Sequence, residues 1–215
     1  MATSGATEGL MTAGEVVRTA YEIRGAVGIE ADVTGSQMDF GLKQLNWMLK
    51  GWQSDGRDCW RLKDATIAWP ADTPEAELDE NYLDILNLRF EDRRALERWS
   101  REEVAAGIVD KAQAGEPVIY CPWRERDRLW LRLWPTPAAA ATLRADVLRV
   151  AEDVTSPGET LDIQQEWTEA VIYNLSTRLV GGDLKLVGIV EQRAAELYRR
   201  LPQFDLSGSI FLQPA

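Results

Sequence analysis

The segment Arg128–Trp134 constrains the fold more than any other part of the chain, because leucine alternates in it with arginine and tryptophan. Successive side chains of a β-strand point to opposite faces of the sheet. Leu129, Leu131 and Leu133 therefore share one face, which predicts contact with a buried core. The other face carries Arg128, Trp130, Arg132 and Trp134. The segment predicts a strand that separates a core from a cationic and aromatic surface.

This second surface has two interpretations. We use the name Arg/Trp face for Trp123, Arg128, Trp130, Arg132 and Trp134. Arginine and tryptophan are enriched among residues that anchor interfaces, so the face is a candidate contact with another subunit or a partner. Alternatively, the arginines stack on the tryptophans as a solvated local cluster, with cation–π contacts of about 0.5–1 kcal/mol each. The sequence leaves both interpretations open.

Composition excludes many kinds of catalytic site. The chain has no histidine, which removes the most common general base, metal ligand and pH switch. Cys59 and Cys121 have no partner at metal-ligand or redox spacing, so we predict that they are buried apolar residues. Most hydrolase mechanisms are thereby excluded, and we expect neither a metal site nor a cofactor.

The net charge of −11 opposes long-range attraction to nucleic acid. The same repulsion suits a passage through which DNA slides without sticking. No apolar run approaches the roughly 18 residues that span a bilayer, and the N-terminus lacks the basic and apolar regions of a signal peptide. We expect a protein that is made and folded in the cytoplasm, without a membrane partner.

Both ends of the chain show the periodicity of amphipathic helices. The expected helices cover residues 12–27, 34–54, 162–181 and 183–201. Thr12 and Glu15 have the spacing of a capping box, which predicts the start of the first helix. Asp183 is the predicted cap of the last helix.

The middle of the chain changes to short stretches rich in tryptophan and β-branched residues, which are typical of strands. Leu86, Leu88 and Phe90 alternate with polar residues and predict a half-buried strand. A second capping box at Ser100 predicts a short helix. The acidic stretch that begins at Thr73 is expected to be a solvated face, with Thr73 capping one further short helix.

These patterns predict an α+β fold: mainly an α-helical bundle formed by the N- and C-terminal helices, with a small antiparallel β-sheet inserted. Residues 1–56 and 151–201 form the two parts of the bundle, and residues 57–150 form the β-rich insertion. Residues 202–215 form an extended tail that is too short to fold alone.

The tail is predicted to bind a partner, because its apolar side chains need a surface to cover them. These side chains are Phe204, Leu206, Ile210, Phe211 and Leu212.

Three stretches of the chain carry an ordered pattern. The first is Leu45-Asn46-Trp47-Met48-Leu49, followed by Trp52 and Gly56. The second is Gly115-Glu116-Pro117, followed by Leu131, Leu133, Pro135 and Pro137. The third is Thr160-Leu161-Asp162, followed by Ala170, Tyr173, Asn174 and Leu175. The set resembles the head-to-tail adaptor family of tailed bacteriophages, also called tail accessory factors or head completion proteins.

The resemblance implies a structural protein of the virion neck that is not an enzyme. It implies assembly as a dodecameric ring beneath the portal protein, where the ring seals packaged DNA and offers a platform to a tail or nozzle protein. The expected partners are the portal, the tail or nozzle protein and further copies of the chain. DNA would pass through the lumen without sequence-specific binding. In this family the C-terminal segment often extends along the portal, which makes the tail the expected portal-binding segment.

Two other classes of function stay open at this stage. One is a virion glycosidase that degrades peptidoglycan with a glutamic acid of raised pKa and a second carboxylate. The 35 acidic residues offer many such pairs and no means of choosing among them. The other is a DNA-binding regulator that uses the arginine-rich hairpin as a stacking platform, which the overall acidity opposes.

Overall fold

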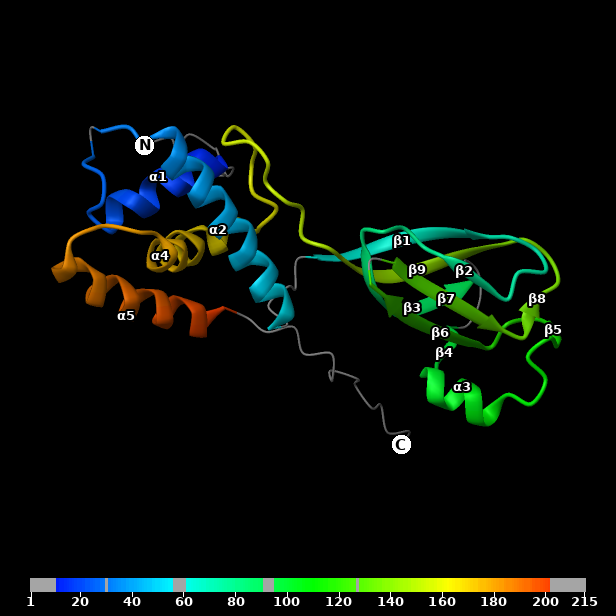
Figure 1. The fold of residues 1–215 in the computed structure, drawn as a ribbon. Coiled ribbons are helices and arrows are strands. Elements are labelled where there is room, and N and C mark those ends of the chain that lie inside the picture. The colour runs from blue at the N-terminus through cyan, green and yellow to red at the C-terminus, as the bar shows by residue number, and fades with distance from the viewer. Residues whose placement is uncertain (1–10, 30, 56–60, 91–94, 127, 202–215) are drawn as a thin grey trace, which may run out of the picture. The chain divides into compact units, whose positions relative to one another are not determined.

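The computed structural model describes residues 11–29, 31–55, 61–90, 95–126 and 128–201. The chain divides into two compact units, shown in Figure 1. The helical unit comprises residues 1–60 and 151–215, and the sheet unit comprises residues 61–150. The first unit is therefore assembled from both ends of the chain, whereas the second is one continuous segment.

Four helices surround the core of the helical unit. They are α1 (Ala13–Ile23), α2 (Gly35–Ser54), α4 (Thr168–Arg178) and α5 (Leu184–Arg200). The predicted capping box of α1 is confirmed: the Glu15 backbone N–H donates to the Thr12 hydroxyl, and the Glu15 carboxylate accepts from the Thr12 N–H at 2.7 Å. The predicted cap of α5 is confirmed as well, since Asp183 accepts from the Lys185 N–H at 2.9 Å. A 3-10 turn, Gln165–Trp167, precedes α4.

Close packing and one polar clamp hold α2 in the helical unit. A Cβ atom at Gly41 would lie 2.4 Å from a methyl group of Val17, so α1 and α2 approach each other where only glycine fits. Asn46 donates to the Val154 carbonyl at 2.8 Å and accepts from the Val154 N–H at 3.0 Å. The clamp satisfies both backbone groups of a buried residue, which explains why an asparagine stands in the first family stretch.

The sheet unit contains three sheets. An antiparallel sheet has the order β1-β9-β3, formed by β1 (Leu62–Trp69), β9 (Ala141–Arg149) and β3 (Tyr82–Phe90). A mixed sheet has the order β2-β7-β6-β4, formed by β2 (Glu75–Glu77), β7 (Arg128–Trp134), β6 (Ile119–Glu125) and β4 (Glu97–Arg98). The short strands β5 (Ala114–Gly115) and β8 (Thr136–Pro137) pair in parallel.

The mixed sheet has a core on each of its two faces. On one face Leu129, Leu131 and Leu133, each at most 1% exposed, pack with apolar residues of the antiparallel sheet. The predicted core contact of these leucines is thereby confirmed. On the other face lies α3 (Arg101–Gly107), whose predicted capping box is also confirmed. Figure 1 shows α3 beside β4 and β6.

The predicted fold class is wrong in its proportions and its sheet. Helix accounts for 39% of the structure and strand for 29%, so the chain is not mainly a helical bundle with one small antiparallel sheet. The strands form three sheets, one of them mixed, and the described residues contain five helices. The cause is local, because β4, β5 and β8 are two residues long and leave no periodic pattern.

The acidic stretch also differs from its prediction. Thr73 caps no helix; the residues after it form β2, which pairs antiparallel with β7. The pairing places Glu75 directly opposite Arg132, so cross-strand charge pairing favours a strand where composition favours a helix.

Candidate protein interface

The tryptophans of the Arg/Trp face stack within the β6–β7 hairpin. Trp123 and Trp130 are directly opposite in the register, and their ring centroids lie 6.1 Å apart at an interplanar angle of 12°. The face is half-buried, because α3 covers part of it. The indole N–H of Trp130 is buried and has no hydrogen-bond acceptor among the described residues.

The arginines of the Arg/Trp face form ion pairs with β2. Arg128 Nη1 lies 2.8 Å from Glu77 Oε2, and Arg132 Nη2 lies 2.7 Å from Glu75 Oε2. The Arg128 side chain is 62% exposed and that of Arg132 is 29% exposed, so each pair contributes at most about 1 kcal/mol. The acidic stretch therefore neutralises much of the cationic character that the sequence predicted for this face.

Trp134 fixes the chain that follows α3. Its indole N–H donates to the Asp110 carbonyl at 2.9 Å. Its ring packs with Trp99 and Trp123 against a small core of Val104, Ile108 and Cys121. Cys121 is buried, as predicted, whereas Cys59 lies outside the described residues.

Arg101 supplies a cation–π contact that sequence analysis missed. Its Cζ atom lies 5.2 Å from the ring centroid of Trp123. Arg101 is on α3 and meets the hairpin only because that helix folds back across the mixed sheet. No local sequence signal indicates such a contact, and the sequence had offered Arg128 and Arg132 for this role.

A small pocket lies between α3 and the Arg/Trp face, and we refer to it as the α3 pocket. Its volume is about 210 Å³. Its lining consists of Glu75, Arg101, Val104, Ala105, Lys111, Cys121, Trp123 and Arg132. Burial raises the pKa of the Cys121 thiol, although Arg132 and Arg101 nearby favour the thiolate. Three cations and one carboxylate thus face one cavity of a chain that is acidic overall.

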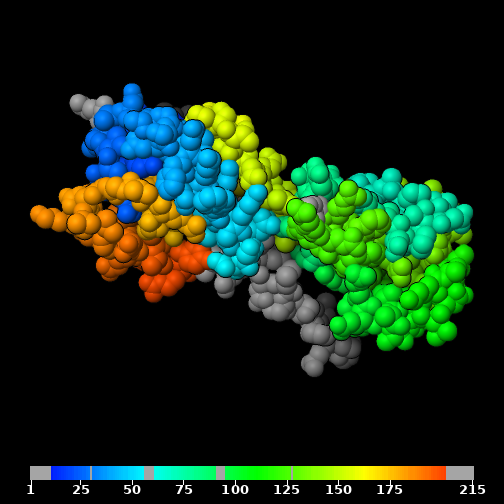
Figure 2. All heavy atoms as spheres, in the orientation of Figure 1, coloured from blue at the N-terminus to red at the C-terminus, as the bar shows by residue number. Residues whose placement is uncertain are grey.

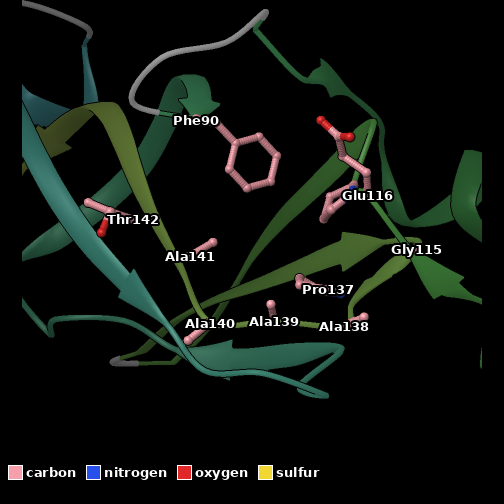
Figure 3. Close-up of a pocket in the computed structure, with 10 residues that line it drawn as sticks. Phe90, Gly115, Glu116, Pro137, Ala138, Ala139, Ala140, Ala141 and Thr142 are labelled. Atoms are coloured by element: carbon pink, nitrogen blue, oxygen red, sulfur yellow. The ribbon is translucent and has the colours of Figure 1, made fainter.

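An open apolar pocket lies between Gly115–Pro117 and Pro137, the two ends of the second stretch that resembles the adaptor family. Gly115 pairs with Pro137 across β5 and β8, and a Cβ at Gly115 would lie 3.4 Å from Pro135. Figure 3 shows the Phe90 ring directed toward the space bounded by Ala141, Pro137 and Glu116. The pocket measures about 610 Å³. Spacing in the sequence could not predict that these two parts of the stretch line one cavity.

The helical unit exposes apolar side chains in two of its loops and at the start of α5. Leu184 is 88% exposed, Val180 is 71% exposed and Ile29 is 82% exposed. Val180 lies in the connection from α4 to α5 and Leu184 is the first residue of α5; this connection projects from the unit in Figure 2. Exposed aliphatic residues of this kind are candidates for protein contacts.

The predicted portal-binding side chains lie outside the described residues, and their positions stay a prediction. They are Phe204, Leu206, Ile210, Phe211 and Leu212.

The described residues give little support to catalysis or metal binding. They contain no cluster of three or more acidic or cysteine side chains that could hold a metal ion. Hydrogen bonds from helix-capping or turn residues lower the pKa values of Glu15, Glu103 and Glu159, whereas the general acid of a glycosidase needs a raised pKa. Within the described ranges, no helix combines the length and apolar character that crossing a bilayer requires.

Comparison with known protein families identifies the family of the chain. A family model described as SU10 adaptor protein matches residues 11–204. The match spans both the helical unit and the sheet unit. No curated protein matches the chain.

Proposed function

The chain belongs to the SU10 adaptor protein family, a family of phage head-to-tail adaptors, and from this premise we propose that it forms a ring beneath the portal of a tailed phage. The ring is dodecameric, seals the packaged DNA and provides the attachment platform for the tail. The observation that carries the proposal is the extent of the family match, which includes nearly all of both units. Membership implies a structural protein of the virion neck that associates with portal and tail components.

The surfaces of the two units support a ring. A cyclic arrangement of identical subunits uses a heterologous contact, so each subunit needs two different patches. The sheet unit offers the Arg/Trp face with the adjoining α3 pocket. The helical unit offers exposed apolar residues, among them Val180, Leu184 and Ile189. The net charge of −11 supports a lumen through which DNA passes without sequence-specific binding.

Composition supports the tail as the portal contact. Five apolar residues lie between positions 204 and 212, and the family match ends at residue 204. Four of these five residues lie beyond the match, in a segment whose side chains favour burial against a partner.

Electron microscopy of the protein mixed with the portal of the same phage tests the proposed ring. We expect averaged images of the mixture to contain one additional ring beneath the portal. Portal alone is the control. Images in which portals stay bare at saturating adaptor concentration would contradict the proposal.

Deletion of residues 203–215 tests whether the tail binds the portal. We expect the truncated protein to stay folded by circular dichroism and to lose co-sedimentation with the portal. Full co-sedimentation of the truncated protein would remove the tail from the proposal and leave the ring untouched.

A further inference from the structure

The α3 pocket has an excess of positive charge that its own residues do not balance. Arg132 is paired with Glu75, at 2.7 Å. Among the described residues, neither Arg101 nor Lys111 forms an ion pair with a carboxylate. Arg101 and Lys111 therefore line the cavity beside the Arg132–Glu75 pair without a carboxylate partner of their own among the described residues, although the chain carries 35 acidic residues against 24 basic ones.

The geometry of the pocket selects a single carboxylate side chain. Its volume of about 210 Å³ is below the range of about 300–1,000 Å³ that is usual for small-molecule sites, so it suits one inserted side chain. Trp123 holds the Arg101 guanidinium from one side, which restricts its orientation. Val104 and Ala105 supply the apolar part of the lining. A carboxylate that enters can accept hydrogen bonds from Arg101 and Lys111 together.

Charge distribution identifies the source of this carboxylate. The helical unit carries 10 basic and 18 acidic residues, a net charge of −8, whereas the sheet unit carries 14 basic and 17 acidic residues, a net charge of −3. A heterologous ring contact joins two different surfaces of identical chains. The acidic helical unit of a neighbouring copy is therefore a source of carboxylates that every ring contains.

We propose that the α3 pocket receives a carboxylate side chain from the helical unit of the neighbouring subunit. The inference rests on the proposed ring and specifies one of its two contact surfaces. The Arg/Trp face then lies beside the contact, and Trp123 forms part of the pocket wall. Each charge-assisted hydrogen bond in such a contact contributes on the order of tenfold in affinity.

Charge reversal at Arg101 and Lys111 tests whether the cations of the α3 pocket are needed for contact between subunits. We expect the double variant R101E/K111E to stay folded and monomeric in sedimentation velocity, and to add no ring to the portal. The variant K63E/R89E carries the same change of charge on exposed residues of β1 and β3, outside the pocket, and should assemble as the unchanged chain does. The conservative variant R101K/K111R keeps both positive charges and should retain assembly.

Mixing distinguishes a neighbouring subunit from other occupants. The R101E/K111E chain keeps its acidic surface, so it can join one end of a growing arc and then prevent the next addition. We expect an equimolar mixture with the unchanged chain to yield far fewer complete rings than the unchanged chain alone at the same concentration. K63E/R89E in the same mixture should have no such effect.

Each alternative outcome has a different meaning. Ring formation by R101E/K111E at unchanged yield overturns the inference and leaves the proposed function intact. Rings that form normally but no longer bind the portal or the tail protein also overturn it, because the carboxylate then belongs to that partner. Absence of rings with the unchanged chain contradicts the proposed function itself, and the inference with it.

Discussion

The helical unit and the sheet unit differ in the number of their hydrophobic cores and in what those cores leave exposed. The helical unit has one large core, closed by helices from both ends of the chain, and leaves apolar side chains such as Leu184 on its outside. The sheet unit has cores on both faces of its mixed sheet, so β7 supplies leucines to one core and Trp134 to the border of the other. The candidate interface of the sheet unit is therefore positioned by its own internal packing before any partner arrives.

The two units also differ in their net charge, which is −8 for the helical unit and −3 for the sheet unit. In the sheet unit, Glu75 and Glu77 form ion pairs with Arg132 and Arg128, and Asp84 pairs with Arg98. The helical unit has an excess of eight acidic residues. The larger excess of carboxylates therefore lies on one unit, while a cavity lined by Arg101 and Lys111 lies on the other.

Removing one core leucine from each unit is the strongest test of their independence. Leu131→Ala in the sheet unit and Leu45→Ala in the helical unit each delete a side chain with 0% exposure. Each should lower the free energy of unfolding by about 2–5 kcal/mol. Hydrogen exchange should show loss of protection confined to the unit that carries the change. Equal loss in both units for either variant would show that they unfold as one.

Substituting Asn46 and Asn87 compares the stability contributed by a buried clamp in the helical unit with that of an exposed hydrogen bond in the sheet unit. Asn46→Ala leaves both backbone groups of Val154 without partners and should cost about 3 kcal/mol in chemical denaturation. Asn87→Ala removes only an exposed hydrogen bond of 3.0 Å to Asp146 and should cost less than about 0.5 kcal/mol. Similar costs for the two variants would contradict the role given to Asn46.

Alkaline pH should weaken the sheet unit through Tyr120. Burial raises the pKa of this tyrosine from 10.0 to about 12. The unfolded chain therefore loses the proton first, so its contribution to stability is complete below pH 10 and is lost as the pH rises to about 12. The loss should reach roughly 2–3 kcal/mol.

Tyr120→Phe provides the control for this pH dependence. It should flatten the alkaline decline of stability in denaturant titrations. At neutral pH it should cost about 1 kcal/mol, because the hydroxyl donates to the Leu86 carbonyl at 2.8 Å. An unchanged alkaline decline would assign the effect to other residues.

The capping boxes of α1 and α3 give a further comparison of the two units, with a small expected effect. Ser100→Ala and Thr12→Ala should each cost about 1 kcal/mol. Only Ser100→Ala should loosen α3 and speed the reaction of Cys121 with a thiol reagent, measured in a Cys59→Ser background. Equal Cys121 reactivity in both variants would show that α3 does not protect the thiol.

Local signals made part of the fold predictable. Thr12 and Ser100 cap helices through residues three positions away, so a short stretch of sequence contains the whole interaction. The leucine face of β7 was predictable for the same reason, because alternation is a property of one strand. In β3 the alternation of Leu86, Leu88 and Phe90 predicted the wrong set of buried residues. An irregularity in the pairing between Ile85 and Asn87 places Ile85 and Leu88 in the core and leaves Leu86 only half-buried.

The rest of the candidate site depends on contacts between distant residues. The sequence identified the Arg/Trp face, but Glu75 lies 57 positions from the Arg132 that it pairs with. Arg101 and Lys111 join the face only through the path of α3 and the loop after it. Such contacts follow from tertiary pairing, which no single segment encodes.

The register that pairs Leu62 with Leu148 has an evolutionary consequence. It brings the first and last strands of the sheet unit together, so the segment leaves and rejoins the rest of the chain at neighbouring points. Recombination can exchange a segment with this geometry as one cassette without rebuilding the helices around it. In the proposed ring, such an exchange would replace the proposed contact surface of the sheet unit in a single genetic step.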